Sequence, residues 1–144
     1  MTKETKEIIE ERLLKLEEAT SILEKFKNIP EKEFVQDQKT NYAAMYALIL
    51  GIESICDIGS HILSYHFQEK VTTYKDTISL LAKHQIIPNL LKTKSIKMTD
   101  FRNVLIHIYV KIDLKEVHKS VKEAPKQFRQ YAKYFQKFLD TTNK

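Results

Sequence analysis

Hydrophobic residues recur at helical spacing along most of the chain. Over the first 28 residues, Ile9, Leu13 and Leu16 begin an apolar series that has charged residues between its members, as in an amphipathic helix. The segment "NIPEKEFVQD" interrupts the series at Pro30, where a loop is expected. No alternation of useful length between apolar and polar residues indicates a strand, so the pattern predicts an all-α protein.

Further helical stretches follow the break. They cover about residues 37–67, 73–84, 88–109 and 113–140. In the last of them, Pro125 must kink or interrupt the helix. In the helix expected at residues 37–67, the predicted buried side holds Tyr42, Met45, Ile49, Ile52, Cys56 and Leu63. These lengths and short connections predict an antiparallel up-and-down bundle of four to five helices.

Composition limits the class of protein. A chain of 144 residues with two Gly and three Pro is most simply one domain, residues 1–144. Cys56 is the single cysteine and cannot form an internal disulfide. The N-terminus is charged, without the apolar segment of a signal peptide. The longest apolar run, residues 42–52, is shorter than the ~18 residues that suggest a membrane span. We therefore expect a soluble, cytoplasmic protein with no membrane association.

Charge is distributed unevenly. Residues 1–37 carry seven basic and ten acidic side chains, whereas residues 83–144 carry fourteen and five, within a net charge of +5. A basic C-terminal half is compatible with an anionic partner, although lysine-rich surfaces are also common in proteins without one.

The segment "FRNVLIHIYVKID", residues 101–113, places polar groups on an otherwise apolar helix. On a helical wheel its core stripe holds Phe101, Val104, Leu105 and Ile108. The opposite face holds Arg102, Asn103, Ile106, His107 and Tyr109. An Ile in the middle of a polar face suits a surface that meets another protein, so two antiparallel copies of this face could form a twofold interface.

Arg102 and His107 have the chemistry to cleave RNA without a metal ion. The reaction removes a proton from a 2′-OH, stabilises charge on a five-coordinate phosphorus and protonates the leaving oxygen. Histidine exchanges protons near neutral pH, and the arginine fork matches phosphate oxygens. Asn103 could orient His107 or bind phosphate. Arg102 and His107 lie about 140° apart on the helix. They can therefore meet at one phosphate only if the Arg102 side chain swings round or a partner subunit supplies one of the two residues.

These residues resemble a known family. "RNVLIH" followed by "IY" is similar to the R-x4-6-H motif of HEPN domains, in the R-x4-H-x-Y form of HepT-like toxins, the partners of MntA-type minimal nucleotidyltransferase antitoxins. "DQKTNYAAMYALILGIESICDIGSHIL" and "TYKDTISLLAKHQIIPNLLKTKSIKMTDFRNVLIHIY" resemble the family's preceding blocks. The resemblance is clearest over residues 34–139.

The resemblance implies a helical bundle that forms a homodimer, with the two motifs in a cleft at the interface. It implies a metal-independent endoribonuclease that needs no cofactor and is neutralised by a nucleotidyltransferase. By the resemblance, Arg102 and His107 are the catalytic pair, Asn103 is auxiliary, and Tyr109 receives AMP. An attached nucleotide would repel RNA through its bulk and negative charge.

An acidic stripe on the preceding long helix raises two hypotheses. Glu53, Asp57 and His61 are spaced four residues apart, but the Glu-x-x-His pairs of bundled di-iron sites are absent, so no metal is expected. The preferred hypothesis is that Glu53 or Asp57 faces the cleft and holds Arg102 by a charge-assisted hydrogen bond.

A second stripe runs along the last helix, provided that Pro125 leaves its helical phase intact. This basic stripe consists of Lys115, Lys119, Lys122, Lys126, Arg129, Lys133 and Lys137. The opposite, apolar face holds Val117, Val121, Phe128, Tyr131, Phe135 and Leu139. The stripe is either a solvated surface over a buried one or a surface for RNA or for an acidic antitoxin.

Two other functions remain open at this stage. The protein could be a non-catalytic partner that presents a nucleotide or a tyrosine to a nucleotidyltransferase. It could also be a bundle whose polar face serves only for dimerisation. The sequence has no Gly-rich phosphate loop, cysteine cluster or serine nucleophile elbow, so any catalysis is expected on the helix of Arg102.

Overall fold

The computed structural model describes residues 1–107 and 109–142, apart from the side chain of Tyr109. These residues form an all-α fold, as predicted. In chain order the elements are α1 (Lys3–Phe26), α2 (Glu31–Gln36), α3 (Gln38–Phe67), α4 (Tyr74–Lys83), α5 (Asn89–Ser95), α6 (Lys97–His107), the 3-10 helix η1 (Tyr109–Lys111) and α7 (Leu114–Thr142).

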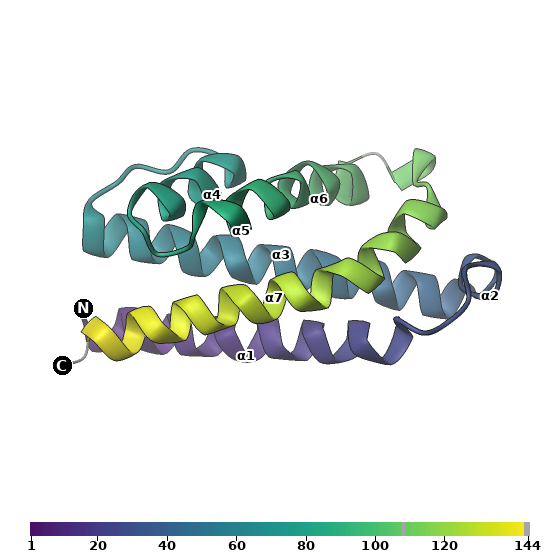
Figure 1. Ribbon diagram of the computed structural model, residues 1–144, viewed down its shortest axis with the longest axis horizontal. Helices are drawn as coiled ribbons and strands as arrows, with labels where there is room; N and C mark the ends of the chain where they lie inside the picture. Colours follow the sequence, from purple (N-terminus) through teal and green to yellow (C-terminus); the bar gives the residue numbers. More distant parts are fainter. Residues whose placement is uncertain (108, 143–144) are drawn as a thin grey trace.

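Three long helices make up the body of the bundle. Figure 1 shows α1, α3 and α7 running lengthwise, with α4, α5 and α6 following one another along α3. The short helices α4 to α6 together take the place of a fourth long helix, and the chain runs up and down between the two ends of the molecule. The start of α1 and the end of α7 lie at the same end of the bundle (Figure 1).

Polar residues define where the helices begin. Thr2, Asp37 and Thr73 each accept a hydrogen bond from the backbone N–H three residues later, which satisfies a donor that has no partner within the helix. Hydrogen bonds from Thr40 lower the pKa of the Asp37 carboxyl. These caps explain why the observed starts of α3 and α4 agree with the predicted ones.

Small residues let α3 lie close to its neighbours. At Gly51 an added Cβ would lie 2.0 Å from Cε2 of Phe128, a fully buried residue of α7. Glycine is therefore required here by the close approach of an aromatic ring, which outweighs its low helix propensity.

The region predicted as one helix from residue 88 to 109 is divided, so that prediction is wrong. α5 ends at Ser95, and α6 starts at Lys97. The Ser95 hydroxyl donates to the Leu91 carbonyl and is also hydrogen-bonded to the buried Tyr131 hydroxyl. Side-chain hydroxyls that bond to the backbone compete with regular helical bonding, and here the hydroxyl also ties the end of α5 to α7.

The predicted loop around residue 30 is also partly helical. α2 follows Pro30, and its one buried residue, Phe34, anchors it to the bundle. His118 of α7 packs its ring against Phe34 at 5.2 Å between centroids, and its Nε2 lies 2.7 Å from the Ile29 carbonyl oxygen. These long-range contacts, rather than the local sequence, stabilise this short helix.

The predicted buried side of α3 is correct in part. Ile52, Cys56 and Leu63 are buried, but Tyr42 is 59% exposed. The smaller residues Ala44, Ala47 and Gly51 take the tightest core positions instead, which turns Tyr42 outwards.

α3 is long and apolar enough to span a membrane by length and composition. Within the bundle, 61% of its most apolar window is buried. α3 is therefore the central core helix, in contact with α1, α4, α6 and α7.

Candidate active site

Arg102 of α6 is held by three side chains around its guanidinium. Its Nε donates a hydrogen bond to Oε1 of Glu53 at 2.5 Å, and its Nη1 donates to Oδ1 of Asn103 at 3.0 Å. Its Nη2 donates to the hydroxyl oxygen of Tyr74 at 3.4 Å. Glu53 belongs to α3 and Tyr74 to α4, so three helices meet at this cation.

Tyr74 supports Arg102 in two further ways. The Tyr74 ring lies 4.7 Å from Cζ of Arg102, a cation–π contact. Its hydroxyl donates to Oε2 of Glu53 at 2.7 Å. Burial, and after it the bond with Glu53, raises the pKa of Tyr74 to about 12. The phenol is therefore neutral and able to donate at physiological pH.

These contacts leave donors on Arg102 for a ligand. A guanidinium carries five N–H donors in one plane. Glu53, Asn103 and Tyr74 use one donor on each of its nitrogens. One N–H remains on each terminal nitrogen, which is enough for a bidentate contact with two oxygens of a phosphate.

A hollow of about 430 Å³ opens beside Arg102 and Asn103. Its other lining residues are Thr73, Tyr74, Lys75, Thr99 and Asp100. Among them, Nζ of Lys75 lies 3.6 Å from Oδ2 of Asp100. The volume is within the range of sites for small ligands, so the hollow beside Arg102 is large enough for a small ligand.

The prediction that Arg102 lies opposite the core is wrong. Its side chain is only 18% exposed, because α6 packs against α3 and Arg102 reaches Glu53 there. Leu105 is buried as predicted, whereas Phe101 and Val104 are only half-buried. A helical wheel gives the angles between residues of one helix but not how far its neighbours wrap around it.

His107 lies apart from Arg102 within one chain. It is the last residue of α6 and is exposed, as is Asn103. No hydrogen bond or ion pair involves His107 among the described residues. Tyr109 opens η1, but its side chain and all of Ile108 lie outside the described residues. The structure of a single chain therefore brings Asn103 to Arg102 and does not bring His107 there.

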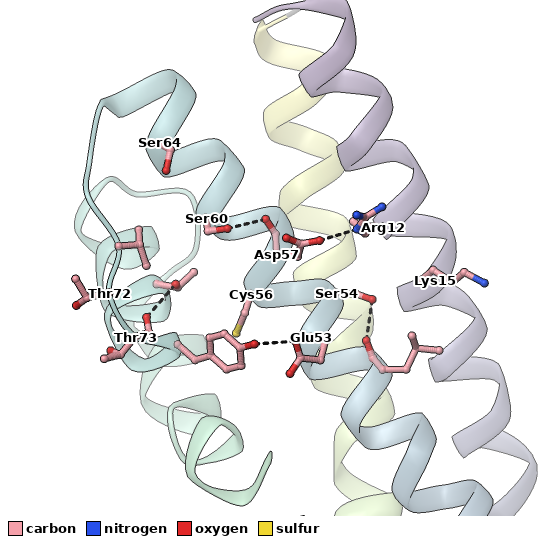
Figure 2. A pocket seen from close by; sticks show the side chains of 14 residues that line it. Arg12, Lys15, Glu53, Ser54, Cys56, Asp57, Ser60, Ser64, Thr72 and Thr73 are labelled. Atoms are coloured by element: carbon pink, nitrogen blue, oxygen red, sulfur yellow. Dashed lines mark hydrogen bonds and ion pairs between the residues drawn. The ribbon is translucent and has the colours of Figure 1, made fainter. Parts of the chain in front are cut away.

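Of the two acidic residues proposed to hold Arg102, only Glu53 does so. Asp57 instead accepts a hydrogen bond from Nε of Arg12 at 2.6 Å, joining α3 to α1 (Figure 2). This bond is the main cause of the raised pKa of Arg12. His61 lies 3.6 Å from the other oxygen of Asp57.

Glu53 and Asp57 also line a groove of about 710 Å³ between α1, α3 and the start of α4 (Figure 2). Its hydroxyl groups bond largely within the chain, as Ser54 does to the Leu50 carbonyl and Ser60 to the Asp57 carbonyl. Among the described residues, no group of three or more His, Cys, Asp or Glu side chains is placed to hold a metal ion. Within this groove the ion pair between Arg12 and Asp57 joins α1 to α3.

α7 runs without interruption through Pro125, so the helical phase of the basic stripe is intact. All the stripe residues, Lys115, Lys119, Lys122, Lys126, Arg129, Lys133 and Lys137, are exposed. All the residues of the apolar face, Val117, Val121, Phe128, Tyr131, Phe135 and Leu139, are buried, as predicted. Arg129 differs from the lysines, because its Nη1 is bonded to Oε1 of Glu24 on α1 at 2.5 Å.

Sequence reasoning missed Tyr74 and Arg12. Nothing in the local sequence relates Tyr74 to a residue on another helix, so its role was not predictable. Arg12 was detectable, since the chain has only three arginines. Each arginine binds a carboxylate on a helix other than its own: Arg12 binds Asp57, Arg102 binds Glu53 and Arg129 binds Glu24.

Comparison with known proteins identifies solved structures with this fold. The chain superposes with a TM-score of 0.81 on the HEPN toxin of Shewanella oneidensis, solved in tri-AMPylated form in complex with its MNT antitoxin, at 21% identity over 94% of this chain and 98% of that one. It is equally similar in fold to YutE of Bacillus subtilis, a cytosolic protein of unknown function, with a TM-score of 0.81 and 19% identity over 93% and 90% of the two chains. Identities this low show the fold alone.

Sequence comparison extends this result. The chain is 28% identical to the tRNA nuclease HepT of Aphanizomenon flos-aquae (strain 2012/KM1/D3) over 134 residues, which are 93% of this chain and 91% of the relative. The model of the ribonuclease HepT-like family matches residues 16–135. Because this match covers most of the chain, the protein belongs to the ribonuclease HepT-like family.

Proposed function

We propose that this protein is the endoribonuclease toxin of a cytoplasmic toxin–antitoxin pair and cleaves RNA without a metal ion. The observation that carries the proposal is the orientation of Arg102 by Glu53, Asn103 and Tyr74, which leaves one N–H on each terminal nitrogen for phosphate oxygens. Membership of the ribonuclease HepT-like family supports the same reaction.

In the proposed reaction, His107 handles the protons and Arg102 the charge. A His107 imidazole removes the proton of the 2′-OH, whose oxygen attacks the adjacent phosphorus. The bond from phosphorus to the 5′-oxygen breaks, and that oxygen takes a proton from an imidazolium. The products are a 2′,3′-cyclic phosphate and a 5′-hydroxyl. Arg102 stabilises the added charge on the five-coordinate phosphorus, and Asn103 is auxiliary.

The active unit is proposed to be a homodimer. Arg102 faces α3 while His107 is exposed at the end of α6, so a phosphate that meets both requires a second copy. Exposed apolar side chains support such an interface: Tyr42 and Tyr46 lie on the same side of α3 as Glu53, and Val110 is 84% exposed in η1. A twofold axis would place Arg102 of each subunit beside His107 of its partner, and that His107 would take the 2′-OH proton and return it to the leaving oxygen.

Glu53 and Tyr74 are proposed as positioning residues rather than catalytic ones. Glu53 holds the Nε edge of Arg102, while the Tyr74 ring supports the face of its guanidinium. Preorganised charges of this kind stabilise a transition state without having to reorient during the reaction.

The proposed inhibitor is a cognate nucleotidyltransferase that adds AMP to Tyr109. The structure of the AMPylated Shewanella oneidensis HEPN toxin with its MNT antitoxin supports this proposal by analogy. Tyr109 follows His107 by two residues and opens η1. An AMP group there would add bulk and negative charge beside the proposed cleft and exclude RNA.

The test is cleavage of bulk tRNA by the purified protein in EDTA. We expect cleavage by the wild type and its loss in Arg102→Ala and in His107→Ala. The matched controls are Arg12→Ala, which removes an arginine bonded to the other acidic residue of α3, and His66→Ala, which removes an exposed histidine. An unmodified wild type that is inactive and still binds a nucleotidyltransferase tightly would favour a non-catalytic partner instead.

A further inference from the structure

The six lysines of the basic stripe form a straight row on α7, which we call the lysine row: Lys115, Lys119, Lys122, Lys126, Lys133 and Lys137. Their successive spacings of three and four residues, or of seven across Arg129, keep them within about 40° of one direction on the helix. The row extends over about 33 Å, at 1.5 Å per residue. It begins near the motif, since Lys115 follows His107 by eight residues.

The lysine row is not neutralised by the protein itself. No carboxylate in the described part of the chain lies within ion-pair distance of any of its six amines. By contrast, Lys6 and Lys15 of α1, and Lys27 directly after it, each pair with a glutamate. On α7, Glu116 and Glu123 lie about 65–85° from the middle of the row, and Asp140 lies in line with the row, three residues beyond Lys137. Asp140 accepts a hydrogen bond from Gln136, and none of the three carboxylates forms an ion pair with a lysine of the row. The row therefore presents a positive charge that no ion pair offsets.

The row lies on the exposed side of α7. The apolar face of α7 is buried on the opposite side, from Val117 to Leu139. A protein interface would be expected to include apolar or aromatic anchors and to be depleted in lysine at its centre. No aromatic or aliphatic side chain interrupts the row. These features fit a polyanion with regularly spaced charges better than they fit another protein.

We propose that the lysine row binds the phosphate backbone of RNA substrates, at a distance from the bond that is cut. Lysine amines act as point charges and contact phosphates without reading bases. A row of this length should bind a long RNA, which can extend from the motif along α7, more tightly than it binds a short oligonucleotide. This inference rests on the proposed ribonuclease function for its biological meaning, but RNA binding by the row is testable without cleavage.

The acidic face of α1 sets one limit of the surface. Glu10, Glu17 and Glu24 line a groove between α1 and α7 together with Arg129 and Lys133. This side of the row repels phosphate, and Arg129 is already bonded to Glu24. The part of the row furthest from these carboxylates, Lys115 to Lys126, is therefore expected to contribute most of the binding.

The experiment compares RNA binding by two variants with equal charge loss. The row variant carries Lys115→Gln, Lys119→Gln, Lys122→Gln and Lys126→Gln. The control variant carries Lys3→Gln, Lys6→Gln, Lys25→Gln and Lys32→Gln. Both are made in the His107→Ala background so that the RNA stays intact, and both are titrated with labelled bulk tRNA and with a six-nucleotide RNA at several salt concentrations.

We expect the row variant to bind tRNA at least about tenfold more weakly than the control, with a salt slope shallower by about three, since each lost phosphate contact removes about 0.7 to 0.9. Binding of the six-nucleotide RNA is expected to change less. Thermal unfolding of both variants should stay close to that of the parent, because the substituted side chains are exposed, apart from the half-buried Lys6.

Equal tRNA affinities and salt slopes in the two variants would overturn the proposal. It is also overturned, in favour of an acidic protein partner, if the row variant keeps RNA binding but no longer associates with a co-expressed nucleotidyltransferase. Failure of the wild type to cleave RNA, with row-dependent binding intact, would refute the proposed nuclease and leave the RNA surface standing.

Discussion

Glu53 and Arg102 are 49 residues apart in the sequence, and a hydrogen bond of 2.5 Å joins Oε1 of one to Nε of the other. The same carboxylate accepts the Tyr74 hydroxyl through Oε2 at 2.7 Å. One side chain of the central helix thus fixes both the arginine of the motif and the ring that supports it. Loss of Glu53 should therefore affect the reaction more than the fold.

Exchanging the two carboxylates of α3 for amides distinguishes a residue that positions Arg102 from one that only joins two helices. Glu53→Gln is expected to lower kcat by roughly tenfold or more, because a misplaced Arg102 loses contact with the transition state. Asp57→Asn is expected to leave kcat within about twofold and to lower stability by about 1 kcal/mol, since its bond to Arg12 is partly exposed. The measurements are RNA cleavage kinetics and urea unfolding. Equal effects of the two substitutions on kcat would contradict the role of Glu53.

Tyr74 should titrate well above an ordinary tyrosine. Its pKa is raised to about 12, first by burial and then by the bond with Glu53. Because the folded pKa is raised, the stability that this neutral phenol contributes is present below pH ~10 and is lost as the pH rises towards 12. Difference titration at 295 nm between the wild type and Tyr74→Phe measures the pKa. Glu53→Gln should lower the pKa of Tyr74 only part of the way towards that of an ordinary tyrosine. A wild-type pKa near 10 would show that Tyr74 is not buried and bonded to Glu53.

Cys56 should be unreactive in the native protein. It is buried on α3, and burial raises the pKa of its thiol to about 12, so almost no thiolate exists at pH 8. We expect Ellman's reagent to label the wild type only as fast as the bundle opens, and at once in urea. Fast labelling of the native protein at pH 8, absent from a Cys56→Ala control, would contradict the burial of this residue.

Gly51 should not tolerate even a methyl group. Alanine would place its Cβ 2.0 Å from Cε2 of Phe128, and overpacking of this kind costs about 1–3 kcal/mol. The gain in helix propensity, about 1 kcal/mol, should not compensate. Urea unfolding of Gly51→Ala is expected to show a net loss of stability, and the loss should shrink in a Phe128→Leu background. A stabilised Gly51→Ala protein would mean that α3 and α7 lie further apart.

Much of the fold was predictable from periodicity, because long amphipathic helices carry a repeated signal. α1, α3 and α7 follow the expected ranges closely, and the buried face of α7 was identified residue by residue. The division between α5 and α6 was not predictable, since it depends on a hydroxyl contact between Ser95 and Tyr131 that joins residues far apart in the sequence.

The candidate site was predictable to a smaller extent. Charge complementarity alone indicated that an acidic residue of α3 would hold Arg102, but only the packing of α6 on α3 selects Glu53 over Asp57. The outward position of Tyr42 and the contacts of Tyr74 with Arg102 depend on which helices surround each residue. A pattern along the sequence does not contain that information.

The most direct test of the shared site is complementation between two inactive subunits. Arg102→Ala and His107→Ala proteins are unfolded together in urea and refolded as a mixture, beside each protein refolded alone and the wild type treated in the same way. If Arg102 of one subunit acts with His107 of its partner, half of the dimers carry one intact site of two, and the mixture should cleave RNA in EDTA at about a quarter of the wild-type rate. A mixture no more active than either variant alone, beside an active wild type, would contradict a site shared between two subunits.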